Sequence, residues 1–416
     1  MVIDMYPIEK IREQFPALQR IEKDYFVGYF DGPGGTQVAK SVIEAMANFM
    51  KNGVSNLGGS YPTAMETAFQ VDEAREYAAT LLGTEKQNIA FGANMTTLTF
   101  RIARALSENW IKNEGNIVVT EMDHHANIDP WLTAAKSKGL AIHTIKLDNK
   151  TKTLDLETLE ETITEQTKLV AIGLASNAIG TINNLEPVVN RAKEIGALVV
   201  LDAVHAVPHF EVNFDQLGAD FLFCSAYKFF GPHVGIAAID AKVFKNLNVF
   251  KLQPAPNEAP EKLETGTLNF EGLVGVTESI RFIASIGEGN FLKEQLTSAY
   301  KKMWHYENHL ADHLRKGLAA LDHVTLYQAA DDVSKTPTVA FQVHEMDAKL
   351  VCHHLAQKYA LHLEYGDFYA MTLVNKLNVK NGELVRAGIA PYNTLEEIDR
   401  LIQAVKELPS LVSDKT

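Results

Sequence analysis

Short apolar runs alternate with amphipathic segments from about Thr84 to Asp240, and two further amphipathic segments precede them. The runs that predict buried strands are Asn116–Thr120, Ala141–Lys146, Lys168–Gly173, Ala197–Leu201, Asp220–Cys224 and Gly235–Ile239. The segments that predict helices are Lys40–Met50, Met65–Leu82, Asn94–Leu106, Asn127–Lys138, Leu154–Glu165 and Leu185–Ile195. This β-α-β order predicts an α/β fold, with a mostly parallel sheet that helices cover.

The pattern changes after about residue 250. Leu252–Thr267 is rich in Pro, Glu and Gly, which predicts a long loop. Beyond it we expect helices at Gly272–Ile286, Phe291–Leu321, Asp347–Lys358 and Leu395–Leu408, the last with a capping box at Thr394 and Glu397. Strands are expected at Val324–Tyr327, Thr338–Val343 and Leu384–Gly388. We therefore predict a large α/β domain over residues 20–288 and a smaller α+β domain from residues 1–19 and 289–416.

Composition supports a globular protein and argues against several partners. The chain has 416 residues, 46% of them hydrophobic and 22% charged, which suits two cores better than one. A formal net charge of −13 without a basic run disfavours nucleic-acid binding. No apolar stretch reaches the length of a membrane span, and the start lacks the features of a signal peptide. With only Cys224 and Cys352 there is no disulfide framework, so we expect a cytoplasmic protein.

Lys228 is the first candidate for chemistry. It lies four residues after the end of the buried run Asp220–Cys224, in Ser225-Ala-Tyr-Lys-Phe-Phe-Gly-Pro232. Ligands of α/β proteins bind at the carboxyl ends of such strands. A desolvated lysine amine has a lowered pKa and can form a Schiff base with a carbonyl. The ordinary alternative is an exposed loop lysine.

Asp202 lies at the end of the preceding predicted strand, one β-α-β step before Lys228. Both side chains should emerge at the same edge of the sheet. A lysine and an acid in this relation suit pyridoxal phosphate, because the lysine holds the aldehyde and the carboxylate keeps the pyridine nitrogen protonated. Taken alone, Asp202 would be interpreted as a helix N-cap.

Other strand ends offer the remaining contacts that such a cofactor needs. Thr96 and Thr97 open a predicted helix, where hydroxyls and free N–H groups bind phosphate, although capping is the simpler explanation. Ser225 and Tyr227 are further candidates for the phosphate. The ring of His124 could stack on the pyridine, and Asn177 could donate to its phenolic oxygen.

Taken in order, these segments resemble a known family. The matching motifs are Asn94-Met-Thr-Thr97, Asp123-His-His-Ala-Asn127, Ser176-Asn-Ala-Ile-Gly-Thr181, Leu201-Asp-Ala-Val-His205 and Ser225-Ala-Tyr-Lys-Phe-Phe-Gly-Pro232. They resemble class V aminotransferase-fold enzymes, and within these the cysteine desulfurase/selenocysteine lyase group. The resemblance runs from Tyr29-Phe-Asp-Gly-Pro-Gly-Gly35 to Arg386-Ala-Gly-Ile-Ala-Pro-Tyr-Asn-Thr394. It implies the type I fold of pyridoxal-phosphate enzymes.

The resemblance also implies roles, position by position. Lys228 would bond the cofactor aldehyde, Asp202 would pair with the pyridinium, and His124 would stack on the ring. Asn177 and His205 would flank the ring, while the phosphate would be held by Thr96, Thr97, Ser225 and Tyr227. Thr267 would reach the phosphate of a neighbouring subunit, which implies a homodimer. Arg386 would clamp the carboxylate of an amino-acid substrate as a planar fork, rather than form a surface ion pair.

One motif of the desulfurases is missing. They carry a cysteine in a small-domain loop, typically within Arg-x-Gly-His-His-Cys. The corresponding stretch here is Glu364-Tyr-Gly-Asp-Phe-Tyr369, which places Tyr369 at the cysteine and Glu364 at the arginine. Cys224 should be an inert core thiol, and Cys352 falls on a predicted helix far from the motif. The chain therefore resembles the branch that lacks this cysteine, with Tyr369 as a catalytic acid, a hydrogen-bond donor or a packing aromatic.

Several reactions remain open at this stage. The leading hypothesis is C–S bond cleavage by β-elimination, which needs no protein thiol, with Lys228 as the base at Cα. Transamination, epimerisation and decarboxylation would use the same early steps. A metal-dependent hydrolase is a remote alternative, because His205 and His209 are four residues apart, but Pro208 lies between them. A non-catalytic protein that has kept the fold is a third reading, which the presence of Lys228, Asp202 and Arg386 does not support.

Overall fold

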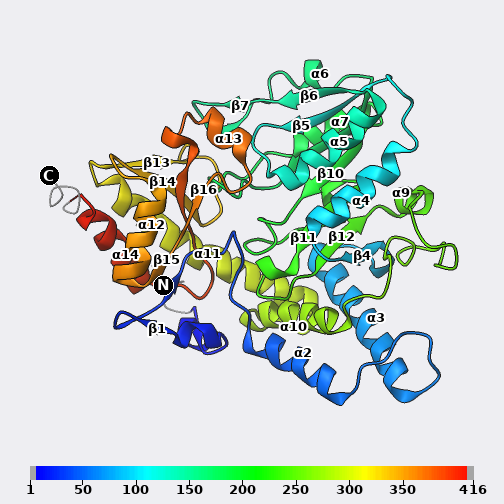
Figure 1. The fold of residues 1–416 in the computed structure, drawn as a ribbon, viewed down its shortest axis with the longest axis horizontal. Coiled ribbons are helices and arrows are strands. Elements are labelled where there is room, and N and C mark those ends of the chain that lie inside the picture. The colour runs from blue at the N-terminus through cyan, green and yellow to red at the C-terminus, as the bar shows by residue number, and fades with distance from the viewer. Residues whose placement is uncertain (1–5, 410–416) are drawn as a thin grey trace.

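The computed structural model describes residues 6–409. Its main feature is a seven-stranded sheet (Figure 1). In spatial order the strands are β4 (Ile89–Gly92), β12 (Gly235–Ile239), β11 (Phe221–Ser225), β10 (Leu198–Asp202), β9 (Thr167–Gly173), β5 (Asn116–Thr120) and β6 (Ala141–Ile145). β12 runs antiparallel to both of its neighbours, and the remaining pairs are parallel. The predicted, mostly parallel sheet is confirmed.

Both faces of this sheet are buried, which explains why its strands are continuous apolar runs. Along β11, Leu222 and Cys224 belong to one hydrophobic cluster, whereas Phe221 and Phe223 belong to a second cluster. Successive side chains of a strand point to opposite faces, so each face packs on its own layer of helices. The helices of this part are α2 (Lys40–Asn52), α3 (Pro62–Leu82), α4 (Met95–Ser107), α5 (Asp129–Lys138), α6 (Leu159–Thr162), α7 (Glu186–Glu194), α8 (Phe214–Leu217), α9 (Ala241–Asn246) and α10 (Phe270–Ile286).

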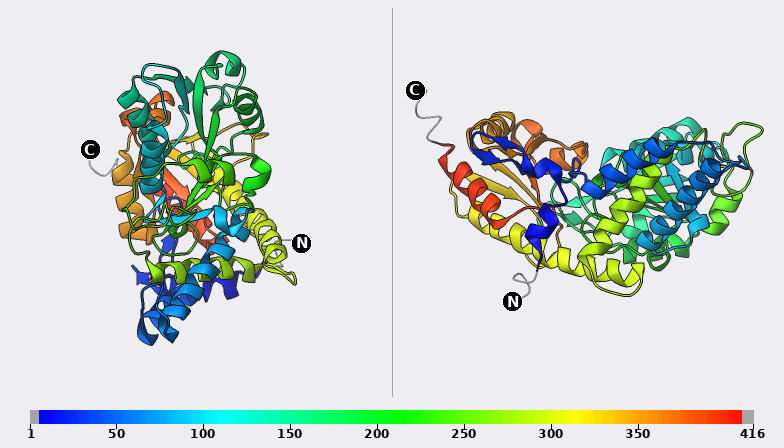
Figure 2. Two further views of the ribbon diagram at one scale, coloured as in Figure 1. Left: turned by 90° about the vertical axis from the view of Figure 1, so that its right-hand side faces the viewer. Right: turned by 90° about the horizontal axis from the view of Figure 1, so that it is seen from below.

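A second sheet of four antiparallel strands forms a separate lobe (Figure 2). Its order is β13 (Val324–Tyr327), β14 (Thr338–Val343), β17 (Leu384–Gly388) and β16 (Glu364–Gly366). The long helix α11 (Leu292–Ala319) reaches from this lobe towards the larger one, and α12 (Ala348–Tyr359), α13 (Met371–Lys376) and α14 (Leu395–Glu407) complete it. The domain boundaries at residues 19/20 and 288/289 stay a prediction.

The first described residues of the chain lie beside the second lobe (Figure 1). α1 (Ile8–Arg12) contacts α14, because Arg12 forms a salt bridge of 2.9 Å with Glu397. Residues 1–5 and 410–416, which the sequence analysis places in the small domain, lie outside the described residues. Short elements complete the fold: η2 (Pro16–Gln19), β1 (Ile21–Glu22), β2 (Tyr25–Phe26), β3 (Gly28–Tyr29), η3 (Lys86–Asn88), η4 (His125–Asn127), β7 (Leu147–Asp148), β8 (Thr153–Leu154), η5 (Ala226–Lys228), β15 (Leu361–His362) and η6 (Lys380–Gly382).

One predicted helix is wrong for most of its length. Leu154–Glu165 contains only the four-residue α6, because Leu154 pairs with Leu147 in a two-stranded ribbon instead. Asp155 then accepts a hydrogen bond from the N–H of Glu157 at 3.0 Å, which stabilises a turn rather than a helix. The predicted capping box at Thr394 and Glu397 is confirmed, and Asn94 with Thr97 forms a second one at the start of α4. Within residues 6–409, no helix is long and apolar enough to cross a membrane.

Candidate active site

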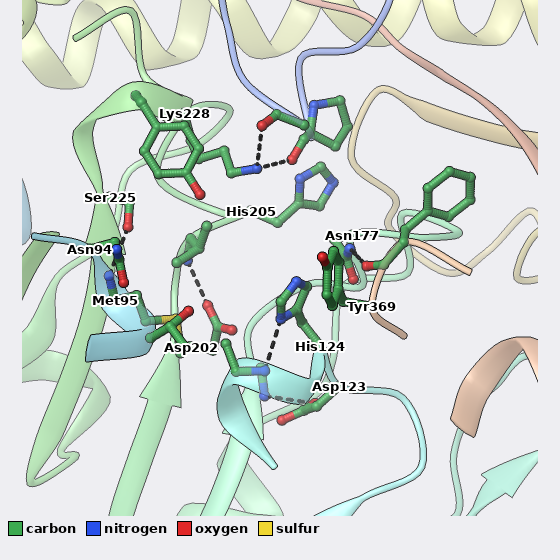
Figure 3. A pocket seen from close by; sticks show the side chains of 18 of the residues that line it. Asn94, Met95, Asp123, His124, Asn177, Asp202, His205, Ser225, Lys228 and Tyr369 are labelled. Atoms are coloured by element: carbon green, nitrogen blue, oxygen red, sulfur yellow. Dashed lines mark hydrogen bonds between the residues drawn. The ribbon is translucent and has the colours of Figure 1, made fainter. Parts of the chain in front are cut away.

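The carboxyl ends of β4, β5, β9, β10 and β11 meet at one edge of the large sheet, and a cavity of about 860 Å³ opens there. β16, β17 and the segment that follows β16 close the other side. Figure 3 shows Lys228, Asp202, His124 and Asn177 around this cavity. The sequence-predicted site residues that line it are Thr96, Thr97, His124, Asn177, Asp202, His205, Ser225, Tyr227, Lys228, Tyr369 and Arg386. Thr267 does not.

Lys228 ends the short helix η5, directly after β11. Its Nζ donates to the carbonyl of Gly34 at 2.8 Å and also to the carbonyl of Pro33. Burial and, to a smaller extent, the positive charge of Arg386 lower the pKa of Lys228 to about 8, while Asp31 acts in the opposite direction. An amine with this pKa is partly unprotonated near neutral pH, as a nucleophile or base must be.

Asp202 is the last residue of β10 and is only 9% exposed. Its Oδ1 accepts the N–H of Val204 at 2.8 Å, and within residues 6–409 its Oδ2 has no hydrogen-bond partner. Burial, with a smaller contribution from the nearby Asp123, raises the pKa of Asp202 to about 7 despite that bond. A nearly buried carboxyl group with a free oxygen facing a cavity is suited to a cationic N–H group of a ligand.

His124 caps η4, where its Nδ1 accepts the N–H of Ala126 at 2.9 Å. Burial lowers the pKa of His124 to about 4, and Lys228 contributes, so the ring is neutral at physiological pH. One face of this ring stacks on Tyr369, with 5.4 Å between centroids and 29° between planes. A neutral imidazole in this place can stack on an aromatic ligand.

Asn94 and Ser225 hold the first turn of α4 in place at the wall of the cavity. The amide of Asn94 accepts the N–H of Thr97 at 2.9 Å, while Ser225 Oγ accepts the N–H of Met95 at 3.1 Å. Gly235 makes this possible, because a Cβ there would lie 2.3 Å from the carbonyl carbon of Asn94. The hydroxyls of Thr96 and Thr97 are on exposed residues of this first turn. The positive end of α4 and the hydroxyl of Thr96 form a cradle suited to an anion, while the hydroxyl of Thr97 donates to the carbonyl of Asn94 at 2.8 Å.

Arg386 lies on β17 of the small sheet and lines the cavity. It is 3% exposed, and its Nη2 forms a salt bridge of 2.7 Å with Asp31. Its Nη1 donates to the carbonyl of Asn177 at 3.0 Å, and its buried Nε has no partner among the described residues. The Oδ1 of Asn177 is likewise buried without a partner, while its Nδ2 donates to the carbonyl of Phe368 at 2.8 Å.

His205 and His209 do not form a metal site. The Nε2 of His205 lies 3.0 Å from the hydroxyls of both Thr336 and Thr338, and His209 contacts the buried Glu307 at 3.2 Å. Across residues 6–409 no three His, Cys, Asp or Glu side chains are placed to hold a metal ion. The described residues therefore provide no set of ligands for the metal ion that a metal-dependent hydrolase would need.

Both cysteines are buried in the core. Cys224 is fully buried in β11, and Cys352 is 6% exposed in α12. Burial raises the pKa of each thiol well above its ordinary value. Neither lines the cavity. As expected for inert core thiols, both are poor nucleophiles.

Sequence reasoning missed two carboxylates of the site. Asp31, which pairs with Arg386, begins the turn Asp31-Gly-Pro-Gly-Gly, and its position in that motif was a usable signal. Asp123 is buried and accepts hydrogen bonds from Gly173 N–H at 3.0 Å and from Asn127 at 2.7 Å. Burial raises the pKa of Asp123 to about 6. It ties the end of β5 to the end of β9 and so fixes the loop that carries His124.

Comparison with known proteins agrees with this geometry. The chain is 30% identical over 414 residues to the aminotransferase-like protein FGM3 of Gibberella zeae, covering 96% of this chain and 98% of that protein. It is 27% identical over 422 residues to a cysteine desulfurase of Escherichia coli O127:H6, covering 98% and 99%. The apo structure of a cysteine desulfurase from Thermococcus onnurineus NA1 superposes with a TM-score of 0.86 at 26% identity, covering 96% of this chain and 97% of that one.

The type I fold of pyridoxal-phosphate enzymes is thereby confirmed. The sequence pattern of one family, "Aminotransferase class-V", matches residues 28–401. Membership of this family implies pyridoxal phosphate as the cofactor. The chain therefore belongs to the aminotransferase class-V family, as an enzyme related to the cysteine desulfurases.

Proposed function

We propose that this protein uses pyridoxal phosphate to act at the Cα of an α-amino acid, and that it cleaves a C–S bond by β-elimination without a protein thiol. One observation carries the proposal. A single cavity is lined by Lys228, Asp202, His124 and Arg386 but by neither cysteine. The same set serves a cofactor and an amino acid, and it offers no thiolate to accept sulfur.

The residues present fit the cofactor. The free Oδ2 of the nearly buried Asp202 suits a pyridinium N–H, and the unsatisfied Oδ1 of Asn177 has room for a further donor. His124 would stack on the ring, and His205 would lie beside it. The start of α4, with Thr96, Thr97, Ser225 and Tyr227, would hold the phosphate. Lys228 would hold the aldehyde.

The chain's own groups then account for the reaction. When bound, the protonated pyridine ring supplies an electron sink for negative charge at Cα. Arg386 holds the substrate carboxylate, and Lys228, with its lowered pKa, accepts the Cα proton. The C–S bond at Cβ breaks, the sulfur leaves as a thiol, and addition of water to the remaining enamine gives pyruvate and ammonia. Every atom is supplied by the substrate and water.

We also propose a homodimer in which Thr267 of a second copy completes the phosphate site. Thr267 is exposed and lies outside the cavity of its own chain. Its loop is fixed by Glu264, which forms a buried salt bridge with Arg75 and accepts the N–H of Phe91 at 2.8 Å. Large apolar side chains are exposed on α2 and α3 of the same lobe, among them Met65 at 64% and Phe69 at 62%. Such a surface is typical of an interface.

Transamination is the second candidate, because a 30%-identical relative is named as an aminotransferase-like protein. A product assay separates the two. With an S-alkyl cysteine, β-elimination gives pyruvate, ammonia and a thiol in equal amounts, whereas transamination, assayed with an added 2-oxo acid that accepts the amino group, gives a sulfur-containing keto acid. With cysteine itself, desulfuration would give alanine.

A variant without cysteines tests whether the reaction proceeds without a protein thiol. Both cysteines are buried, so Cys224→Ala with Cys352→Ala should keep pyruvate formation within about twofold, provided the protein folds. Circular dichroism and cofactor absorbance check the fold. Loss of turnover in a folded, cofactor-loaded variant would contradict the proposal.

A further inference from the structure

The rim of the cavity carries two carboxylates, Glu364 and Asp367. Glu364 lies on β16 and Asp367 follows that strand, and both line the cavity. Their oxygens accept only neighbouring backbone groups: Glu364 from the N–H of Tyr365 at 3.1 Å, and Asp367 from the N–H of Tyr369 at 2.9 Å. Within residues 6–409 neither forms a salt bridge. Glu364 opposes the lowering of the Arg386 pKa, so its charge is partly offset by that guanidinium, whereas the remaining rim charge faces the cavity and solvent.

The cavity as a whole has an excess of acid groups. Its only lysine and arginine are Lys228 and Arg386, and Arg386 is already paired with Asp31. Five carboxyl groups line it, namely Asp31, Asp123, Asp202, Glu364 and Asp367. The phosphate of the cofactor and the carboxylate of a substrate would each add negative charge. A positive charge elsewhere on the substrate would offset this excess, because opposite charges attract strongly where solvent is partly excluded.

The geometry places the two rim carboxylates beside the carboxylate clamp. Glu364 is directly opposite Arg386 in the antiparallel pair β16–β17, so their side chains share one face of the sheet. Asp367 follows in the same rim segment and accepts the backbone N–H of Tyr369, a residue that is 73% exposed and also lines the cavity. An aromatic face beside carboxylates is a favourable environment for an ammonium or guanidinium group.

That this cavity is built for a ligand rests on separate observations. Asp202 is nine-tenths buried and turns an unpartnered oxygen towards it, and the Oδ1 of Asn177 is buried without a partner. We propose that the cavity accepts α-amino acids whose side chain ends in a cation, an ammonium or a guanidinium, with Glu364 and Asp367 as the residues that determine this specificity. The inference rests on the proposed amino-acid site at Lys228 and Arg386, and not on which bond is cleaved.

Matched pairs of amino acids test the specificity on the cofactor-loaded enzyme. S-(2-aminoethyl)-L-cysteine and S-propyl-L-cysteine have nearly the same shape but differ by one positive charge, as do arginine and citrulline. Calorimetry or the change in cofactor absorbance gives each Kd without requiring turnover. We expect the charged member of each pair to bind about tenfold more tightly at low salt, since a partly exposed ion pair is of modest strength. The difference should shrink as salt is raised.

The variants Glu364→Gln and Asp367→Asn remove charge but keep the oxygens that accept the backbone hydrogen bonds. Together they should reduce the preference to about twofold or less while the Kd of the uncharged members stays unchanged. Glu114→Gln, at an exposed position outside the cavity, is the matched control and should keep the preference. Equal affinity within each wild-type pair, or equal weakening of both members in the double variant, would overturn the inference.

The two proposals fail in different ways. If no amino acid of any charge perturbs the cofactor or binds, the proposed function is wrong and the specificity with it. If charged and uncharged members bind equally well, the proposed function stands and the specificity is wrong. If S-(2-aminoethyl)-L-cysteine binds preferentially but yields no pyruvate, the specificity stands and β-elimination is wrong.

Discussion

The two sides of the cavity are built differently. On the side of the large sheet, Asp202 and Ser225 end buried strands and are held by backbone hydrogen bonds. On the side of the small sheet, the rim passes through Phe368 and Tyr369, which both have positive φ values, of 55° and 56°. This conformation is costly for residues other than glycine, so the surrounding contacts must hold it. We infer that the rigid side serves the cofactor, and that the strained, exposed rim serves the substrate.

The largest effect is expected on the rigid side. Replacing Lys228 by Ala removes both the proposed bond to the aldehyde and the base at Cα, so turnover should fall by at least about 10³-fold. Borohydride reduction followed by peptide mapping should label Lys228 in the wild type and nothing in the variant. Lys168→Ala serves as a control that should retain label and activity. A variant that still carries a reducible linkage at another lysine would refute the assignment.

Asp202→Asn also tests the side of the cavity formed by the large sheet, and its expected effect on turnover is smaller than that of Lys228→Ala. An amide keeps the shape and the acceptor for Val204 N–H but cannot carry the charge that stabilises a pyridinium. We expect kcat to fall by about 10²–10³-fold, while the cofactor absorbance shows a ring with an unprotonated nitrogen. Unchanged kcat in a protein loaded with cofactor would mean that Asp202 acts only as a cap of the turn after β10.

Arg386 connects the two sides, and its substitution should affect binding more than turnover. Arg386→Lys keeps the charge but loses the planar fork, so KM for an amino acid should rise by roughly 10–100-fold with a smaller change in kcat. The matched comparison is an amine that lacks the carboxylate, whose affinity should be nearly the same in both proteins. If the amine loses affinity equally, Arg386 is a structural partner of Asp31 and not a carboxylate clamp.

The rigid side could be predicted from the order of its strands, whereas Tyr369 and Arg386 on the other side were predicted only through the family resemblance, and the conformation of the rim was not predicted. Lys228, Asp202 and Ser225 end apolar runs, and the parallel order of those runs brings their ends together. The pairing of Arg386 with Asp31 joins residues far apart in the chain, and no local pattern encodes it. The strand β16 is only three residues long, and the positive φ values of Phe368 and Tyr369 are imposed by tertiary contacts such as the hydrogen bond from Asn177 to the carbonyl of Phe368. Local propensity gives no signal for these features.

The pH dependence of cofactor capture tests whether the two sides are coupled electrostatically. The pKa of Lys228 is lowered to about 8 by burial and by Arg386, and only the unprotonated amine attacks an aldehyde. The rate at which the cofactor-free protein binds pyridoxal phosphate should therefore rise with pH and level off above about 8. In Arg386→Gln the midpoint should move to higher pH, because the positive charge that favours the neutral amine is gone. An unchanged midpoint would mean that burial alone sets the pKa of Lys228.

Substitution of Tyr369 should change kcat and KM least, and it tests whether the ring or the hydroxyl of this rim residue matters. Its ring stacks on His124, whereas its hydroxyl has no hydrogen-bond partner within residues 6–409. If only the ring matters, Tyr369→Phe should keep kcat and KM within about twofold, while Tyr369→Ala should raise KM by roughly two- to tenfold through loss of the stacking. If the phenol is instead a catalytic acid, Tyr369→Phe should lower kcat by about 10²-fold or more at unchanged KM. Because Phe and Ala require the same positive φ as Tyr at this position, a difference between the two variants reports on the ring and not on backbone strain.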